Sequence, residues 1–397
     1  MRSMIVGCGF VFGAFRWEPT APSTRKKRYV IKQFAKSFPI LVAGSVVTAI
    51  SGVIAGVMGL AGPSTNILFV AWLFVPAPAL LAFLLFRDIS NRLRKASLIY
   101  ILISVLSTGL LLLAVGWSGS ETALHPKPCK DMEELSEYPQ LEMATEEVSF
   151  TASDGTKLEG WVAFGTSETA VLLLHGYRCD KRSMLLRASM LFEAGMTVFL
   201  FDFRNTGESG GDFTSFGYYE KLDLAAALDL LERLDFGRND GNQTLNSVGL
   251  LGLSNGGATA ILYAAENPGR VDALIAESSF KSLDSAVSQS FTHFVGLPAF
   301  PFAPITVWIT ERRTGISRKA IMPEKSVQEL QDIPILIIHG MEDDIISFQD
   351  SESIYSGAGQ AKELWLVPES VHGDAPEVAG IEYRERIVGF FGRYLVK

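Results

Sequence analysis

The sequence predicts an α/β domain over residues 146–397, with a mostly parallel sheet covered by helices on both faces, preceded by three membrane-spanning helices. Three observations carry this prediction. Short apolar runs alternate with stretches of helical spacing along the second part of the chain. Three windows in the first part contain no Asp, Glu, Lys or Arg. A basic N-terminal part also precedes an acidic remainder.

The uncharged windows are residues 38–62, 66–86 and 96–117, and each is long enough to cross a bilayer. One charge at the centre of a membrane helix costs about 2.5–3.5 kcal/mol, so its absence from all three windows favours membrane spans over buried core helices. Residues 1–37 form a basic segment, and four more basic residues lie between the second and third windows. The positive-inside rule therefore predicts a cytoplasmic N-terminus and an extracytoplasmic domain after Trp117.

The charge distribution indicates which partners to expect. Residues 1–117 carry 12 Lys and Arg but only 2 acidic residues, a net charge of +10. The remainder carries 23 basic and 41 acidic residues, a net charge of −18. This division is typical of a membrane anchor that bears a solvated domain, and the acidic part predicts no nucleic-acid binding. We expect contact with membrane lipid, and the sequence does not determine the oligomeric state.

The three cysteines, Cys8, Cys129 and Cys179, form neither a metal-ligand cluster nor a disulfide framework. The predicted topology puts Cys129 and Cys179 on the same side of the membrane, which allows a disulfide between them, but we favour free thiols. No His/Asp/Glu cluster has the spacing of a metal site, so we expect no metal and no other cofactor.

Residues 118–145 have the composition of a linker, and the pattern changes after them. The turn signal Asp154-Gly155 predicts an antiparallel hairpin that leads into a parallel sheet. Strands are predicted at 147–151, 157–163, 170–174, 197–201, 247–251, 273–276, 335–338 and 364–367, and helices at 182–193, 219–234, 258–266, 350–355 and 382–394.

Ser254 is the candidate nucleophile. It lies in Gly252-Leu253-Ser254-Asn255-Gly256-Gly257, between a predicted strand and a predicted helix, which is the pattern of a nucleophile elbow. The small residues two before and two after the serine allow a tight turn where strand and helix crowd together. Such a turn lifts the hydroxyl clear of the sheet and sets helix N–H groups beside it.

A serine nucleophile needs a base, and the base needs an orienting carboxylate. Asp343 follows the predicted strand at 335–338, and His372 follows the one at 364–367. With Ser254, they stand in the order Ser, Asp, His, each beyond the carboxyl end of a strand, where α/β sheets bind ligands. Asp344 is an alternative acid, whereas Asp374 is too near His372 in sequence to orient its ring from behind.

We interpret the other polar residues near the site as structural. We interpret His175 and His339 as residues that brace their loops, Glu277 as a satisfied polar group at a strand end, and His293 as structural.

A tetrahedral oxyanion also needs donors, and losing one typically costs about 3–4 kcal/mol of transition-state stabilisation. We expect the backbone N–H groups of Asn255, at the start of the elbow helix, and of Tyr177, in the loop after the strand at 170–174.

These motifs carry a family resemblance. Residues 146–397 resemble the α/β-hydrolase superfamily, and are most similar to its prolyl-oligopeptidase and dienelactone-hydrolase branch of serine hydrolases. The resemblance rests on His175-Gly176, the stretch 202–209, the elbow, His339-Gly340-x-x-Asp343 and His372-Gly373. It implies an α/β-hydrolase fold and a Ser-His-Asp triad. One departure is Asn205-Thr206, which stands where the superfamily usually has Gly-His or Gly-Tyr; we expect the loop to remain intact.

The resemblance also implies a lid, which we place at residues 280–331. Its aromatic residues and prolines are interpreted as lining an acyl pocket, resting against the membrane, or burying the lid's own core. The sequence thus predicts a membrane-anchored serine hydrolase that acts on an ester, thioester or amide, with an ester bearing an apolar acyl group favoured. A peptidase, an acyltransferase and a non-catalytic membrane scaffold or sensor are the alternatives.

Overall fold

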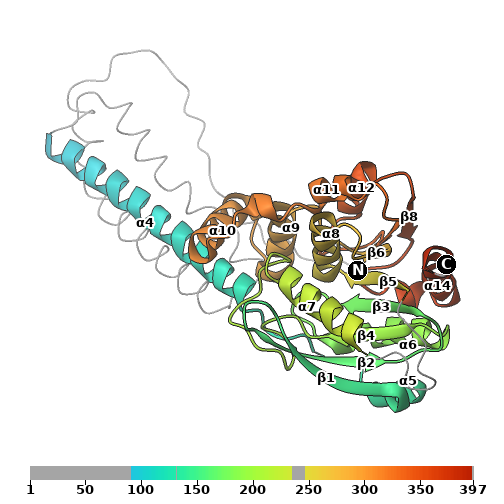
Figure 1. Ribbon diagram of the computed structural model, residues 1–397. Helices are drawn as coiled ribbons and strands as arrows, with labels where there is room; N and C mark the ends of the chain where they lie inside the picture. Colours follow the sequence, from blue (N-terminus) through green and yellow to red (C-terminus); the bar gives the residue numbers. More distant parts are fainter. Residues whose placement is uncertain (1–90, 131, 235–245, 396–397) are drawn as a thin grey trace, which may run out of the picture. The chain divides into compact units, whose positions relative to one another are not determined.

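The computed structural model describes residues 91–130, 132–234 and 246–395 (Figure 1). The chain divides into two compact units, and residues 107–397 belong to the second. The predicted spans at 38–62 and 66–86, and the basic segment 1–37, lie outside the described residues. The third predicted span, 96–117, falls within helix α4 (Asn91–Leu124). Within α4, Ile101–Leu124 is the one described helix long and apolar enough to cross a membrane, with a mean hydropathy of 2.1.

Helix α4 continues through residues 118–124, the first part of the segment predicted to be a linker. The reason is a tertiary contact with helix α10 (Ala299–Thr314). A Cβ atom on Gly116 would lie 2.6 Å from the side chain of Ile305, so the two helices approach closely there. The Thr310 hydroxyl donates to Ser120 Oγ at 3.0 Å, one turn further on. Packing and hydrogen bonds therefore extend the helix beyond its apolar part.

The second unit is built on an eight-stranded sheet with the order β1-β2-β4-β3-β5-β6-β7-β8. β1 pairs antiparallel with β2, and β2 with β4, whereas all other pairs are parallel. All eight predicted strands are present, so the prediction of a hairpin followed by a parallel sheet is confirmed. The strands are Thr145–Thr151, Lys157–Ala163, Thr169–Leu174, Thr197–Phe201, Ser247–Leu253, Ala273–Glu277, Ile335–Gly340 and Lys362–Val367.

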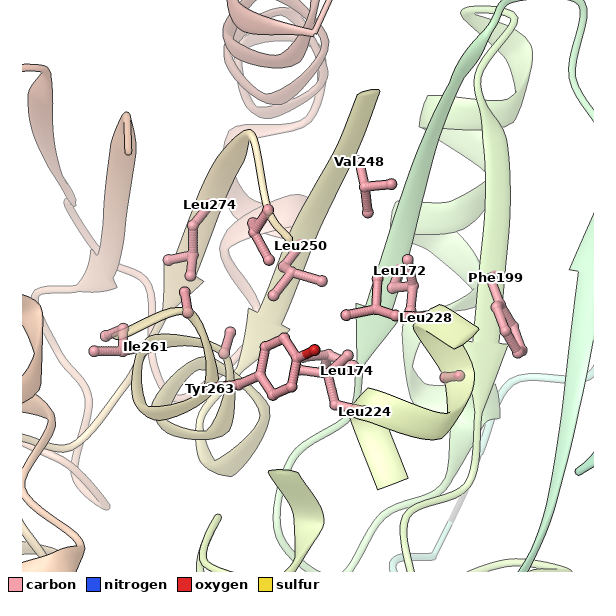
Figure 2. Packing of buried hydrophobic residues seen from close by; sticks show 14 of the residues in the cluster. Leu172, Leu174, Phe199, Leu224, Leu228, Val248, Leu250, Ile261, Tyr263 and Leu274 are labelled. Atoms are coloured by element: carbon pink, nitrogen blue, oxygen red, sulfur yellow. The ribbon is translucent and has the colours of Figure 1, made fainter. Parts of the chain in front are cut away.

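Helices cover both faces of the sheet, and the strands alternate their side chains between two cores. Leu172 and Leu174 of β3 join one core, with α7, α8 and α12, and part of it is shown in Figure 2. Val171 and Leu173 join the other core, with α6 and α14. This follows from the two-residue period of a strand, and it explains why these strands are continuously apolar. The helices are α5 (Pro139–Ala144), α6 (Leu185–Glu193), α7 (Glu220–Arg233), α8 (Asn255–Glu266), α12 (Phe348–Gly357), α13 (Ala375–Ala379) and α14 (Ile381–Tyr394).

The chain between β6 and β7, which includes the predicted lid at 280–331, is a helical insertion. It holds α9 (Leu283–Val295), α10 and α11 (Pro323–Ser326). Leu283 of α9 and Val307 of α10 are buried in a small core with Phe216 and Leu262 of the main domain. The insertion is therefore anchored on the domain by an apolar core that the two share. In the same insertion, Phe300 is 80 % exposed.

Candidate active site

Ser254 stands at the turn between β5 and α8, as the elbow pattern predicted. Its φ of 53° and ψ of −111° are strained for a residue other than glycine. A Cβ on Gly252 would lie 2.4 Å from the backbone of Gly256, and one on Gly256 would lie 2.0 Å from the carbonyl oxygen of Leu174. The backbone N–H of Ser254 donates to the carbonyl of Glu277 at 2.7 Å. The glycines therefore permit a turn that the neighbouring strands hold in place.

Asp343 and His372 meet at the ends of neighbouring parallel strands, β7 and β8. His372 Nδ1 lies 2.7 Å from Asp343 Oδ2. The Asp343 carboxylate is buried, and its Oδ1 accepts the N–H groups of Ile345 at 3.0 Å and Ile346 at 2.8 Å. Burial alone raises the pKa of Asp343, but hydrogen bonds from His339 and His372 outweigh it and hold this pKa well below its usual value. Asp343 is thus an ionised hydrogen-bond acceptor for the histidine ring.

The alternative acids point elsewhere. The Asp344 side chain is 67 % exposed, and its carboxylate lies 3.3 Å from Nδ1 of His293 in the lid. Asp374 accepts the hydroxyl of Ser370 at 2.7 Å. Of the three aspartates near His372 in the structure, Asp343 is the one hydrogen-bonded to it.

The serine, the histidine loop and the loop after β3 converge. A Cβ on Gly373 would lie 3.3 Å from the side chain of Leu253, so the histidine loop rests against the residue before Ser254. A Cβ on Gly176 would lie 3.5 Å from the Cβ of Ser254, which brings Tyr177 beside the elbow. Within the described part of the chain, Ser254 and His372 are not hydrogen-bonded to each other. Such catalytic hydrogen bonds often tighten only when substrate binds.

The two predicted oxyanion donors belong to residues next to this convergence, one in α8 and one in the loop after β3. Asn255 is the first residue of α8, so its N–H is among those that an α-helix leaves without an intrahelical partner. Tyr177 follows Gly176 in a loop that we call the oxyanion loop, residues 175–180. Burial raises the pKa of the Tyr177 phenol above its usual value, so the phenol is a neutral donor at physiological pH.

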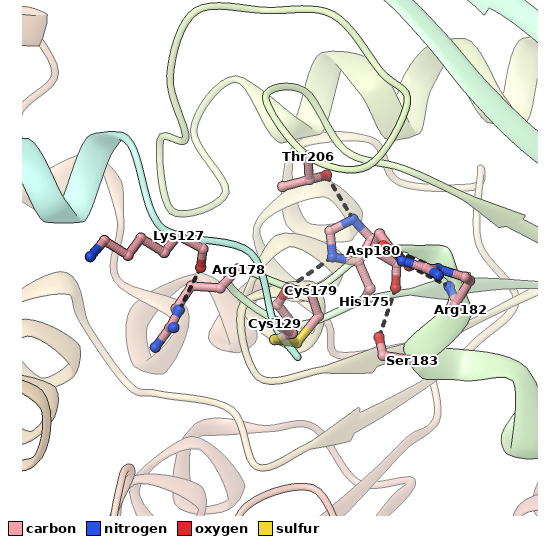
Figure 3. Close-up of a disulfide and its surroundings, with 10 residues drawn as sticks. Lys127, Cys129, His175, Arg178, Cys179, Asp180, Arg182, Ser183 and Thr206 are labelled. Atoms are coloured by element: carbon pink, nitrogen blue, oxygen red, sulfur yellow. Dashed lines mark hydrogen bonds and ion pairs between the residues drawn. A yellow bond between two sulfur atoms is a disulfide. The ribbon is translucent and has the colours of Figure 1, made fainter. Parts of the chain in front are cut away.

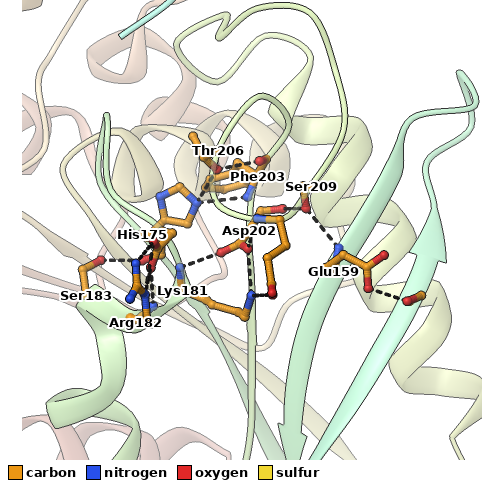
Figure 4. Close-up of polar contacts among 12 residues, drawn as sticks. Glu159, His175, Lys181, Arg182, Ser183, Asp202, Phe203, Thr206 and Ser209 are labelled. Atoms are coloured by element: carbon orange, nitrogen blue, oxygen red, sulfur yellow. Dashed lines mark hydrogen bonds and ion pairs between the residues drawn. The ribbon is translucent and has the colours of Figure 1, made fainter. Parts of the chain in front are cut away.

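His175 begins the oxyanion loop and braces it, as the sequence analysis interpreted (Figure 4). The ring is buried, and burial lowers its pKa, which keeps it neutral. Nδ1 lies 2.8 Å from the carbonyl oxygen of Gly176, and Nε2 accepts the N–H of Phe203 at 3.0 Å. Nδ1 is therefore the protonated nitrogen, and the ring links the loops that follow β3 and β4. His339 is likewise buried, with Nδ1 2.6 Å from Ser351 Oγ.

The departure at Asn205-Thr206 has a local explanation. Asn205 has a φ of 59°, a left-handed conformation that asparagine tolerates better than most residues. The Thr206 hydroxyl lies 3.2 Å from His175 Nε2 and donates to the carbonyl of Phe203 at 2.6 Å. The loop is therefore intact without the usual glycine.

A buried polar network behind the histidine loop was not predicted. Glu277, expected to be a satisfied polar group, forms an ion pair with Arg187 at 2.6 Å and accepts the Tyr383 hydroxyl at 2.6 Å. Arg187 also donates to the carbonyl of Gly373 at 2.7 Å. Burial disfavours the charged form of Arg187, but Glu277 raises its pKa above the usual value. The network thus joins α6, β6 and α14 to the residue after His372.

The cysteine prediction was wrong. Cys129 and Cys179 form a disulfide with a Cα–Cα distance of 4.9 Å (Figure 3). The two residues meet because the chain after α4 runs along the oxyanion loop, where the N–H of Cys129 donates to the carbonyl of Arg178 at 3.0 Å. No local signal in the sequence reports this contact, since 50 residues separate the two cysteines.

Comparisons with known proteins agree with this architecture. A profile of the prolyl oligopeptidase family matches residues 182–397. YqkD of Bacillus subtilis is 28 % identical over 241 residues, which cover 59 % of this chain and 75 % of YqkD. YfhR of Escherichia coli K12 is 30 % identical over 256 residues, which cover 62 % of this chain and 80 % of YfhR.

Among solved structures, the esterase Pf2001 of Pyrococcus furiosus superposes with a TM-score of 0.55 at 24 % identity, covering 68 % of this chain and 98 % of the esterase. At that identity the likeness establishes the fold, and the sequence profile establishes the family. This chain belongs to the prolyl oligopeptidase family and is a hydrolase of the α/β-hydrolase type.

Proposed function

We propose that this protein is a membrane-anchored serine hydrolase that cleaves an ester, thioester or amide through an acyl-enzyme. The observation that carries the proposal is the hydrogen bond of 2.7 Å between His372 Nδ1 and the buried Asp343, in a loop packed against a strained serine elbow. A carboxylate at Nδ1 leaves Nε2 as the nitrogen that can accept a proton from Ser254.

In this mechanism Ser254 Oγ attacks the substrate carbonyl while His372 Nε2 takes its proton. Asp343 stabilises the imidazolium that forms. The oxyanion accepts hydrogen bonds from the backbone N–H groups of Tyr177 and Asn255. His372 then returns the proton to the leaving group, and a water molecule activated by the same histidine releases the acyl group from Ser254.

The apolar side chains of the lid favour a substrate with an apolar acyl group. Its helix α9 ends at two contacts with the loops that flank the site. His293 pairs with Asp344 beside the acid, and the ring of Phe294 lies 5.1 Å from the guanidinium of Arg178 in the oxyanion loop. Phe294 and Trp308 are each 46 % exposed, so the lid carries apolar surface, and Phe294 lies beside the loop that holds Tyr177.

Membrane anchoring and the predicted orientation belong to the same proposal. Helix α4 supports it because its outward side chains are apolar; those at least 47 % exposed are Leu98, Ile99, Leu102, Ile103, Val105, Leu106, Leu110, Leu113 and Trp117. The disulfide supports the extracytoplasmic placement of the hydrolase domain, because structural disulfides persist mainly in oxidising compartments. The N-terminus is then cytoplasmic, with three spans before the domain.

A fluorophosphonate probe tests the nucleophile and the base in the full-length protein in detergent. We expect wild-type protein to be labelled, and Ser254→Ala and His372→Ala to remain unlabelled. Ser279→Ala is a matched control, because Ser279 is another buried serine near the elbow and its loss leaves labelling unchanged. Labelling of Ser254→Ala at the wild-type rate would contradict the proposal.

A peptidase is the second candidate, because the matching family profile is that of prolyl oligopeptidases, which are named as peptidases. The triad is shared by both activities, so substrate choice must separate them. We expect p-nitrophenyl esters of increasing chain length to be hydrolysed faster than peptide p-nitroanilides by the same preparation. The reverse ranking would favour the peptidase.

A further inference from the structure

The end of α4 is capped by groups of the hydrolase domain. An α-helix leaves its last four carbonyl groups without intrahelical donors. The Tyr177 phenol donates to two of these carbonyls, Thr122 at 2.8 Å and Ala123 at 3.2 Å. The carbonyl of Leu124 accepts the N–H of Thr214 at 2.9 Å. One of the capping side chains thus belongs to the residue whose backbone N–H is the proposed oxyanion donor.

The strap, residues 125–129, continues this contact along the oxyanion loop (Figure 3). Arg178, directly after Tyr177, has a φ of 72°, a left-handed conformation that is strained for a residue other than glycine. Its carbonyl accepts the N–H of Cys129 at 3.0 Å, and its Nε donates to the carbonyl of Lys127 at 2.9 Å. The strap therefore binds the strained residue through both its backbone and its side chain.

A covalent bond completes the attachment. The disulfide joins Cys129, the last residue of the strap, to Cys179, which follows Arg178. Cys179 in turn donates its N–H to the carbonyl of Gly176 at 3.3 Å, the residue before Tyr177. Three consecutive residues of the oxyanion loop, 177–179, are consequently bound to α4 or to the strap.

We propose that the last turn of α4 and the strap position the oxyanion hole, so that the helix contributes to catalysis as well as to anchoring. This inference rests on the proposed serine-hydrolase function. An oxyanion donor must lie about 2.7–3.1 Å from the oxygen it stabilises, so a small displacement of the Tyr177 N–H weakens transition-state binding. Tyr177 and Cys129 are positioning residues in this proposal, because the Tyr177 side chain binds α4 and the Cys129 side chain binds Cys179, and neither side chain acts on the substrate.

The first test is Tyr177→Phe in the full-length protein in detergent, with active sites titrated by fluorophosphonate. The change removes the phenol's two hydrogen bonds but keeps the backbone N–H and the ring, which stacks on Phe216. We expect kcat for a short ester to fall about 10-fold per titrated site, less than the roughly 100-fold loss that follows removal of an oxyanion donor, with KM unchanged. Cys129→Ser combined with Cys179→Ser should change kcat in the same direction.

The affinity for a trifluoromethyl ketone distinguishes a positioning role from a merely structural one, because loss of structural support alone would not change it per titrated site. Its adduct with Ser254 carries an oxyanion, so its affinity should fall by the same factor as kcat in both variants. Tyr138→Phe is the matched control. The Tyr138 phenol donates to Glu133 at 2.9 Å on the same linker, away from the oxyanion loop, so kcat and ketone affinity should stay at wild-type values.

The outcomes separate the two proposals. Wild-type kcat and ketone affinity per titrated site in Tyr177→Phe and in the cysteine double variant overturn the positioning role, even if thermal stability falls. A wild-type protein that is folded but neither labels nor binds the ketone contradicts the serine-hydrolase function, and the positioning role with it. Parallel losses of kcat and ketone affinity, with the Tyr138 control unchanged, support the positioning role.

Discussion

The two halves of the candidate active site are held by different parts of the chain. Asp343 and His372 lie in the loops after neighbouring strands and bind each other directly, and His339, at the end of β7, lies 3.1 Å from the Asp343 carboxylate. The oxyanion loop, in contrast, is bound to α4 and the strap, which precede the whole domain in sequence. The acid–base half therefore depends on contacts within the domain, whereas the oxyanion half is also bound to a segment that precedes the domain in sequence. Variants in the two halves should therefore have different effects on kcat and on the free energy of unfolding.

The largest effect is expected in the acid–base half. Asp343→Asn keeps the shape of the side chain but removes the charge that orients His372, and kcat should fall about 10⁴-fold. Steady-state ester hydrolysis per titrated active site measures it. Asp344→Asn is the paired control, since Asp344 faces the lid, and a comparable loss there would identify Asp344 as the acid.

The network behind the histidine loop is expected to have the next largest effect. Arg187→Met leaves Glu277 as an unpaired buried charge, so the free energy of unfolding should fall by about 3–5 kcal/mol. Chemical denaturation measures this difference. Arg187→Met combined with Glu277→Gln removes both charges and should lose less stability than the two single changes added together. A strictly additive double variant would show that the pair is not coupled.

Removing the strap's covalent bond should lower stability by a similar or smaller amount. Cys129→Ser combined with Cys179→Ser is expected to cost about 2–5 kcal/mol, because the disulfide closes a long loop in the unfolded chain. Thermal unfolding with and without a reductant provides the measurement. The wild type should lose stability with the reductant, and the double variant should not respond to it.

The smallest effect concerns pH. The folded-state pKa of Asp343 lies below its ordinary value of 3.8, so this carboxylate contributes stability above that value and loses the contribution as pH falls through the lowered pKa. Asp343→Asn lacks this contribution. The stability gap between wild type and Asp343→Asn should therefore shrink below about pH 4 in denaturation curves. A gap that stays constant down to pH 2 would rule out this linkage.

Those parts of the site that depend on local pattern can be predicted from the sequence. The elbow is recognisable because the close contact of Gly252 with Gly256 excludes larger residues at both positions. Asp343 and His372 are recognisable because each follows a continuously apolar strand. The catalytic roles of Ser254, Asp343, His372, Tyr177 and Asn255 are predictions; the labelling experiment tests Ser254 and His372, and the kinetics of Asp343→Asn test the acid.

Other parts had no local signal. Arg187 and Glu277 are 90 residues apart in sequence, and Glu277 and Tyr383 are 106 apart, yet all three side chains meet in one buried network. The pairing of Cys129 with Cys179 and the extension of α4 to Leu124 likewise depend on segments that approach only in the folded chain.

By itself, then, the sequence determined the alternation of strands and helices, the turn at Ser254 and the apolar character of α4. Each of these follows from the period of apolar residues or from glycine positions within a few residues. Only the tertiary structure decided what supports the site: Glu277 under the elbow, Arg187 behind the histidine loop, and the strap on the oxyanion loop. The physical reason is that these hydrogen bonds and the disulfide join segments far apart in sequence, which meet only after the chain has folded.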